Sequence, residues 1–285
     1  MKLSKPEADL YVPDGKPVGQ ALARTTHLGI GAHQDDLEFM SLHGILECFD
    51  RADRWYGGVV ITNGGGSART GPYADYSDQQ MQEVRVQEQR EAAALGRYGS
   101  QIQLMFASSE VKDPEDRGPY EDLRAIVELS RPDVVYLHNP ADKHDTHVAC
   151  CTRSLAALRS LPAEARPKKV FGCEVWRDLD WLIDADKQAL PLADLAGLGP
   201  RLNEVFASQI AGGKRYDLAV QGRQMANATF HQSHAVDQHQ ALSFAMDLTP
   251  LVNDASLDIS EFTLEHLRRT TEDVADRLRR MSPVT

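Results

Sequence analysis

Two short stretches of the sequence place histidines and aspartates directly after apolar runs. In AHQDD, His33 and Asp36 are three residues apart and Asp35 lies between them. In HNPADKHDTHVA, His144 and His147 repeat that spacing. Two histidines and one carboxylate form a common catalytic zinc site, which keeps a fourth position open. A carboxylate outside the ligand set can act as a general base, and a further histidine can donate a proton. These residue types suit metal-assisted hydrolysis of an amide.

Each stretch also has an ordinary structural interpretation. Asp35 and Asp36 suit the start of a helix, where carboxylates cap backbone N–H groups and favour the helix dipole. His144 and His147, taken alone, suit solvated or internally paired histidines. Both clusters, however, end a predicted strand and open a predicted helix, and their ligand types are complementary. We therefore favour the metal site, with which a capping role for the aspartates is compatible.

Strands and helices alternate along the first 180 residues and would position both stretches. The alternation predicts an α/β fold, with a mostly parallel sheet and helices on both faces. Open sheets of this kind carry their sites at the carboxyl ends of the strands. The predicted strands are 26–33, 56–62, 101–106, 133–138 and 169–176, and the predicted helices are 35–49, 77–96, 120–130 and 146–161.

The whole chain, residues 1–285, is predicted to form a single domain. Its core covers about residues 26–180, and a C-terminal α/β extension covers about residues 181–285, where the alternation weakens. The polar N-terminal segment is expected to run over the surface. Within the extension, helical patterns cover 201–209, 214–230 and 259–281, and an apolar stretch covers 242–252.

Composition restricts the class of protein. The chain has 285 residues, 42% hydrophobic and 26% charged, as in ordinary soluble globular proteins. A formal net charge of -11 argues against binding to nucleic acid or to an anionic membrane. No apolar stretch reaches the roughly 18 residues of a membrane span. The cysteines lack CxxC spacing and two are adjacent, which predicts a reduced, cytoplasmic protein. They are Cys48, Cys150, Cys151 and Cys173.

AHQDD, ITNGGG, RVQEQREAAALG and DKHDTH together resemble the PIG-L/LmbE-like deacetylases over somewhat more than half of the chain. That resemblance implies a Rossmann-like sheet and removal of an N-acetyl group from an N-acetylglucosamine-type sugar or conjugate. It also implies Zn²⁺ as cofactor, with another divalent ion as the alternative. Carried over by position, the metal ligands are His33, Asp36 and His147. Asp35 matches the general base, and His144 matches the histidine that faces the oxyanion and the leaving amine.

Two positions depart from the family's usual motifs. Gln34 replaces the proline of AHPDD, at a position that supplies no ligand. Thr146 replaces the aspartate of HPDH that normally steadies the catalytic histidine. We expect Asp142 or Asp145 to supply that contact instead. Arg69, in the glycine-rich loop, is the nearest match to the family's substrate-binding arginine, although a solvated loop arginine fits equally well.

Other clusters of polar residues receive structural interpretations. The segment GGGSARTG follows a strand but lacks the order of a phosphate-binding loop. The histidines near the end of the 214–230 helix are interpreted as polar residues at a helix end, with a role in the substrate pocket as the alternative. These are His231, His234 and His239. Ion pairing along one helix is the expected role of Arg85, Glu88 and Arg90.

Three functions are compatible with these residues. The leading one is N-deacetylation of a small amidosugar, without nucleic-acid or membrane partners; a homo-oligomer is allowed, since relatives often assemble. The second is a hydratase of an unsaturated dicarboxylate that uses the same metal site. It requires several cations around the pocket, where only Arg69 and Lys143 are evident. The third is a degenerate sugar-binding module, against which the retained ligands and Asp35 count.

Overall fold

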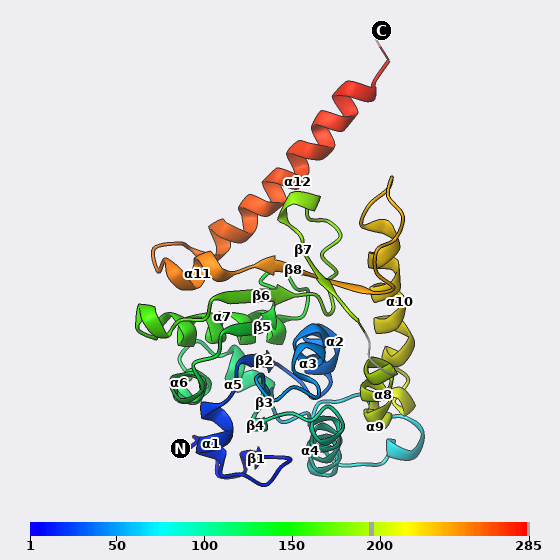
Figure 1. Ribbon diagram of the computed structural model, residues 1–285. Helices are drawn as coiled ribbons and strands as arrows, with labels where there is room; N and C mark the ends of the chain where they lie inside the picture. Colours follow the sequence, from blue (N-terminus) through cyan, green and yellow to red (C-terminus); the bar gives the residue numbers. More distant parts are fainter. Residues whose placement is uncertain (194–196, 284–285) are drawn as a thin grey trace.

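The computed structural model describes residues 1–193 and 197–283, which are arranged around one eight-stranded sheet (Figure 1). The strand order is β1-β4-β3-β2-β5-β6-β8-β7. Neighbours from β4 to β6 run parallel, whereas β1, β7 and β8 pair antiparallel. The predicted α/β fold with a mostly parallel sheet is confirmed. The strands are β1 (Asp9–Tyr11), β2 (His27–Gly31), β3 (Tyr56–Thr62), β4 (Ser100–Phe106), β5 (Val134–His138), β6 (Lys169–Cys173), β7 (Gln188–Pro191) and β8 (Leu242–Asp247).

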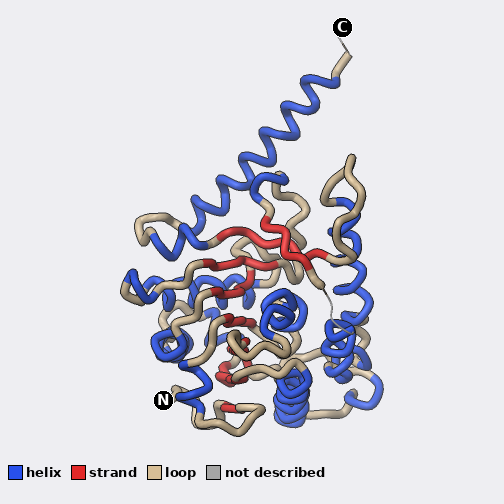
Figure 2. The backbone as a smooth tube through the Cα atoms, viewed as in Figure 1, coloured by secondary structure: helices blue, strands red, loops and turns tan. Residues whose placement is uncertain are grey.

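Helices cover both faces of this sheet (Figures 1 and 2). One face carries α1, α5, α6, α7 and α11, and the other carries α2, α3 and α4, with α8 packed on α4. The α-helices are α1 (Val18–Ala23), α2 (Asp36–Met40), α3 (Leu42–Cys48), α4 (Asp78–Leu95), α5 (Ser108–Lys112), α6 (Gly118–Ser130), α7 (Asp145–Arg159), α8 (Leu198–Val205), α9 (Ala207–Ala211), α10 (Tyr216–Phe230), α11 (Thr249–Asn253) and α12 (Ile259–Met281).

The order of the strands reverses between β2 and β5. From β2 the chain adds β3 and β4 on one side, and then returns to place β5 and β6 on the other. In open α/β sheets this reversal leaves a crevice at the carboxyl ends of the two central strands, because their connections lead away in opposite directions. The AHQDD stretch leaves β2 and the HNPADKHDTH stretch leaves β5 at that edge. The fold therefore brings the two halves of the predicted site together.

In the first quarter of the chain, two expectations differ from the structure. The helix predicted over 35–49 is divided into α2 and α3 at Ser41. The Ser41 hydroxyl bonds the Leu37 carbonyl at 2.6 Å and the Tyr56 hydroxyl at 2.5 Å, which gives this break local hydrogen bonds. The N-terminal segment was expected only to cross the surface. It instead contributes edge strand β1, and α1 buries Ala21 and Leu22 against the core.

The C-terminal extension continues the same sheet. Strand β8 pairs with β6, and β7 pairs with β8, so the apolar stretch over 242–252 becomes β8 and α11. The predicted 201–209 helix is divided into α8 and α9. The final helix, α12, has the bounds that the sequence predicts and extends away from the body (Figure 1). Residues 194–196 and 284–285 of the predicted extension lie outside the described residues.

Candidate metal and catalytic site

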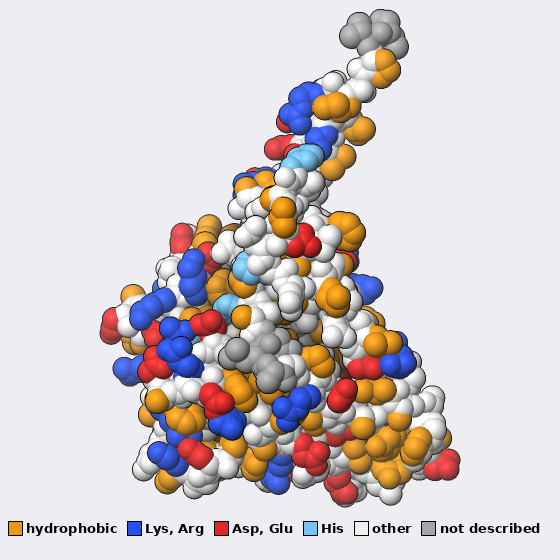
Figure 3. Space-filling view, turned by 45° about the vertical axis from the view of Figure 1, so that its right-hand side comes forward, with side chains coloured by type: hydrophobic (Ala, Val, Ile, Leu, Met, Phe, Trp, Pro, Cys, Tyr) orange, Lys and Arg blue, Asp and Glu red, His pale blue; other side chains and the backbone are white. Residues whose placement is uncertain are grey.

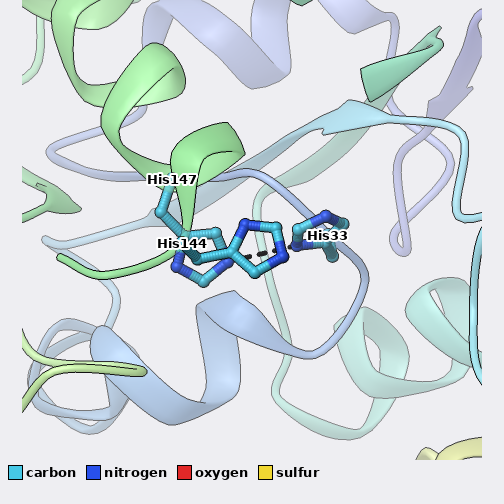
Figure 4. Close-up of side chains that lie close together, drawn as sticks. All are labelled: His33, His144 and His147. Carbon is cyan, nitrogen blue, oxygen red and sulfur yellow. Dashed lines mark hydrogen bonds between the residues drawn. The ribbon is translucent and has the colours of Figure 1, made fainter. Parts of the chain in front are cut away.

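Three predicted ligands converge at the carboxyl ends of β2 and β5. His33 Nδ1 lies 3.3 Å from Asp36 Oδ2, and His147 Nε2 lies 3.2 Å from His33 Nδ1 and 3.5 Å from Asp36 Oδ2. Ligand atoms about 2.1 Å from a tetrahedral zinc ion would be about 3.4 Å apart. Figure 4 shows the rings of His33 and His147 facing each other, with His144 beside them. The spacing and chemistry of these three atoms fit a divalent metal ion.

Neighbouring groups fix the orientation of two of these side chains. The Asp36 carboxylate accepts the His33 backbone N–H at 2.7 Å. His147 Nδ1 lies 3.3 Å from Asp142 Oδ2, and this contact leaves Nε2 turned toward the ligand cluster. Burial alone would raise the pKa of Asp36, but the charge of the neighbouring His147 holds it well below its usual value. An ionised Asp36 is the form that binds a cation.

His138 is a site residue to which the sequence assigned no role. It ends β5, is fully buried and stacks on His147 with ring centroids 3.9 Å apart. Its Nε2 accepts the backbone N–H of Ala32 at 2.9 Å, so the lone pair of that nitrogen is already used. Burial lowers the pKa of His138 to about 4, in agreement with a neutral ring. Although Asp36, His138 and His147 also lie close enough to hold an ion, this hydrogen bond makes His138 a support rather than a ligand.

Asp35 occupies the N-cap position of α2 but does not use its side chain as a cap among the described residues. Its backbone has φ 102°, a conformation that is costly for a residue with a Cβ. The carboxylate is buried beside the ligands, where Oδ2 accepts Arg85 Nη2 at 2.9 Å. Burial raises the pKa of Asp35 to about 6, against the opposing effect of Arg85. The strained backbone thus holds a carboxylate with a pKa close to neutrality.

Arg85 makes the expected ion pair along α4, with Glu88, but it also belongs to the site. Its side chain is fully buried and also donates to the carbonyl of Gln34. Arg85 Nη1 pairs with Glu88 Oε2 at 3.3 Å, and Glu88 accepts both the N–H and the hydroxyl of Ser208 at 2.7 Å. The spacing of residues in α4 alone could not reveal these contacts. Gln34 and Asp35 lie just before α2, and Ser208 belongs to α9. Arg90 forms an ion pair with Asp9 of β1 rather than along α4.

His144 lies next to the ligands, but the contact expected for its ring is absent. Asp142 Oδ1 accepts the backbone N–H of His144 at 3.1 Å, while Oδ2 of the same carboxylate contacts the ring of His147. His144 Nδ1 is buried and has no hydrogen-bond partner in the described part of the chain. Asp145 is exposed at the start of α7, and Thr146 is buried beside the cavity. Burial, followed by the charges of His147 and His33, lowers the pKa of His144.

His33, Asp35, Asp36 and His144 line a cavity of about 620 Å³. Trp176 and Tyr216 form part of its wall; Trp176 is stacked on His144 at 6.2 Å and contacts Tyr216 edge-on at the same distance. Besides Arg85, three cationic side chains line the cavity, Lys112, Lys143 and Arg223. The cavity therefore combines aromatic faces with positive charge above the ligand cluster.

The remaining candidate residues lie apart from the ligands. The Arg69 guanidinium donates to the carbonyls of Gly65 and Tyr76 and pairs with Asp78, while its neighbours Ser67 and Ala68 line the cavity. Its role in substrate binding stays a prediction. The three histidines after α10 are in none of the possible metal-binding groups of the described residues. They are His231, His234 and His239. All four cysteines are buried and free.

Within residues 1–193 and 197–283, no helix has the length and apolar character required to cross a membrane.

Comparisons with known proteins give one family model and several solved structures that are similar to this chain. Residues 28–158 match the PIG-L family model, described as GlcNAc-PI de-N-acetylase, and no curated protein sequence gives a match. A conserved protein from Thermus thermophilus is 18% identical, covers 78% of this chain and 94% of its own, and has a TM-score of 0.57. The N,N'-diacetylchitobiose deacetylase from Pyrococcus horikoshii is 16% identical, with coverages of 77% and 83% and a TM-score of 0.58.

A third similar structure is the 4-carboxy-2-hydroxymuconate hydratase from Pseudomonas putida. It is 13% identical, with coverages of 79% of this chain and 96% of that chain and a TM-score of 0.57. At such identities the solved structures show a shared fold, whereas the family model matches the sequence that carries both halves of the site. Residues 28–158, which hold both halves of the site, therefore match the PIG-L family.

Proposed function

We propose that the protein is a metal-dependent hydrolase that removes an N-acetyl group from an N-acetylglucosamine-type sugar or sugar conjugate. The observation that carries this proposal is the convergence of His33, Asp36 and His147, at 3.2 to 3.5 Å, beside a buried carboxylate and a further histidine. The description of the matched family and the chitobiose deacetylase with the same fold support the same reaction.

His33, Asp36 and His147 are the residues that would hold the ion. A bound zinc or other divalent ion supplies Lewis acidity and lowers the pKa of water toward neutrality. The remaining polar groups then divide the proton transfers between them. Asp35 has one carboxylate oxygen on Arg85 and is placed to accept a proton with the other.

The reaction is written as hydrolysis of the amide. The oxygen of a water molecule bonds to the acyl carbon, and Asp35 takes a proton from that water. The bond between the acyl carbon and nitrogen then breaks, and the imidazolium form of His144 gives a proton to the departing amine. The proton taken by Asp35 then returns the site to its starting protonation state. The products are acetate and the free amino sugar. Trp176 and Tyr216 offer apolar faces to a sugar ring in the same cavity.

A second function, hydration of an unsaturated dicarboxylate, is favoured by one specific observation. Lys112 and Lys143 line the cavity, and neither has a carboxylate oxygen within ion-pairing distance among the described residues. Of these two lysines, Lys112 was not indicated by the sequence alone. Arg223, the third, donates to the carbonyl of Val175. The same metal ligands are compatible with either reaction, so only activity on each class of substrate can distinguish the two.

The test is a substrate screen with the purified protein and its Asp35→Asn variant. We expect acetate release from N-acetylated amino sugars, and no loss of absorbance from unsaturated dicarboxylates. Asn cannot accept a proton at neutral pH, so Asp35→Asn should lower kcat by about two to four orders of magnitude. Metal content, measured by elemental analysis, should stay at that of the wild type.

The matched control is Asp53→Asn, which changes an exposed aspartate paired with Arg51 on the surface. This control should keep full activity and full metal content. Turnover of the dicarboxylate alone would replace the proposed reaction by hydration. A stoichiometric metal bound equally well after His147→Ala would overturn the ligand assignment.

A further inference from the structure

The C-terminal helix α12 carries an apolar seam that nothing in the described chain covers. Its exposed apolar side chains have relative exposures between 43% and 78% and are Leu264, Leu267, Val274, Leu278 and Met281. With Thr271 these positions alternate steps of three and four residues, which is the a and d pattern of a coiled coil. Figure 3 shows hydrophobic side chains exposed on the projecting part of the helix.

A different side of the helix attaches it to the body. Ile259 and Phe262 pack against the main core, and Thr263 is buried. Farther along, Arg269 pairs with Asp186, and the Thr270 hydroxyl donates to the carbonyl of Trp181. Beyond this point the helix extends away from the sheet (Figure 1). The seam is therefore not the face that holds α12 to its own protomer.

The charges of the helix are complementary end to end. Its base carries Asp258, Glu261 and Glu265, and both glutamates pair with Arg268 within the helix. Its tip, in contrast, carries Arg277, Arg279 and Arg280; Arg277 pairs with Asp273 and Arg279 pairs with Asp276, after which no Asp or Glu follows. Two such helices in antiparallel orientation place the basic tip of one beside the acidic base of the other. A parallel pair would gather the arginines of both tips at one end, which is unfavourable.

We propose that α12 pairs antiparallel with α12 of a second copy of this chain, so that the protein is a homodimer. In the register that fills the seam, Leu264 lies against Met281 of the second copy and Leu267 lies against Leu278. The centre is formed by Thr271 and Val274. The pairing removes these apolar side chains from water, which is the driving force, while the charged ends set the orientation.

A groove beside the base of the helix gives the tip a further place to bind. Its lining includes the apolar side chains of Pro140, Val148, Leu257 and Leu264, and its volume is about 730 Å³. In the antiparallel pair, the tip of the second helix arrives next to Leu264. The tip of α12 in the second copy would then contact the groove in the body of the first copy as well as its helix α12.

The experiment measures the mass of the full-length protein by size-exclusion chromatography with light scattering over a dilution series. The wild type should have twice the chain mass of 31.6 kDa and dissociate on dilution. In Leu278→Glu a carboxylate replaces an apolar contact, so the dissociation constant of the dimer should rise by about tenfold or more. Because Leu278 is exposed in the protomer, the variant should keep its fold, and enzymatic activity should be unchanged.

The matched control is Leu129→Glu, which places the same charge on an exposed leucine of α6. It should dimerise like the wild type. A wild type that is monomeric at every concentration would overturn the proposal, and so would equal dissociation of the Leu278→Glu and Leu129→Glu proteins.

Engineered disulfides test the orientation. Leu264→Cys combined with Met281→Cys should cross-link two copies under mild oxidation, whereas neither single variant should do so. The native cysteines are all buried, which keeps the background low. Cross-linking of Met281→Cys alone would indicate parallel helices and would contradict the proposed pairing.

Discussion

At the scale of single residues, a chain of buried polar contacts connects the candidate base to a distant helix. Asp35 binds Arg85, Arg85 binds Glu88, and Glu88 accepts two hydrogen bonds from Ser208 of α9. A buried guanidinium is stable only when carboxylates and carbonyls surround it. The second carboxylate therefore positions Arg85, which in turn orients Asp35.

Glu88→Gln tests this positioning role. The amide removes the negative charge beside Arg85 and can accept with only one of its two terminal atoms. We expect kcat to fall by about tenfold while KM and metal content stay near wild-type values, because Glu88 contacts neither substrate nor metal. The kinetics of acetate release give both constants. Glu83→Gln, on the exposed side of the same helix, should leave kcat unchanged; an equal fall in both variants would refute the role.

At the scale of elements, α4 begins where the sequence predicts a helix start, at Ser77. The structure shows a capping box there between Ser77 and Gln80. The Gln80 N–H donates to the Ser77 hydroxyl at 3.2 Å, and the Ser77 N–H donates to the Gln80 side chain at 2.8 Å. This helix carries Arg85 and Glu88, so its first turn helps to place the buried chain of contacts.

Ser77→Ala should lower the free energy of unfolding by about 1 kcal/mol, because the Gln80 N–H loses its partner at the helix start. Urea unfolding followed by circular dichroism measures this change. Gln79→Ala, in the exposed first turn of the same helix, is the control and should shift the free energy much less. If Ser77→Ala and Gln79→Ala are equally stable, the box makes no net contribution.

At the scale of the whole molecule, burial makes stability depend on pH. His27 begins β2, is nearly buried and lies 3.0 Å from the Thr26 hydroxyl. Burial, with a smaller effect of Arg54, lowers the pKa of His27 to about 4. The unfolded chain, with a histidine pKa near 6.5, then binds more protons than the folded protein between these values. Stability from His27 is complete above about pH 6.5 and is lost as the pH falls toward about 4.

His27→Gln should flatten this dependence, since glutamine does not titrate. Between pH 7 and pH 4.5 the free energy of unfolding should fall more in the wild type than in the variant, by about 1 to 3 kcal/mol. Urea unfolding at the two pH values measures the difference. Parallel losses in both proteins would show that His27 is not responsible.

The sequence by itself determined the alternating strands and helices, and it placed His33, Asp35, Asp36, His144 and His147 at strand ends. These features are local, because the period of the apolar residues and the turn chemistry act over a few neighbours. The break between α2 and α3 escaped prediction, since it includes a hydrogen bond to Tyr56 of another strand.

Only the tertiary structure decided which side chains meet across the sheet. The order of strands places β2 beside β5, so that His138 supports the ligands, Asp142 orients His147 and Arg85 reaches Asp35. Each contact joins residues from elements whose relative position depends on packing of the whole domain. Local periodicity contains no information about such partners. Neither it nor the resemblance could show that Asp142 would contact the ring of His147, leaving the ring of His144 without a carboxylate among the described residues.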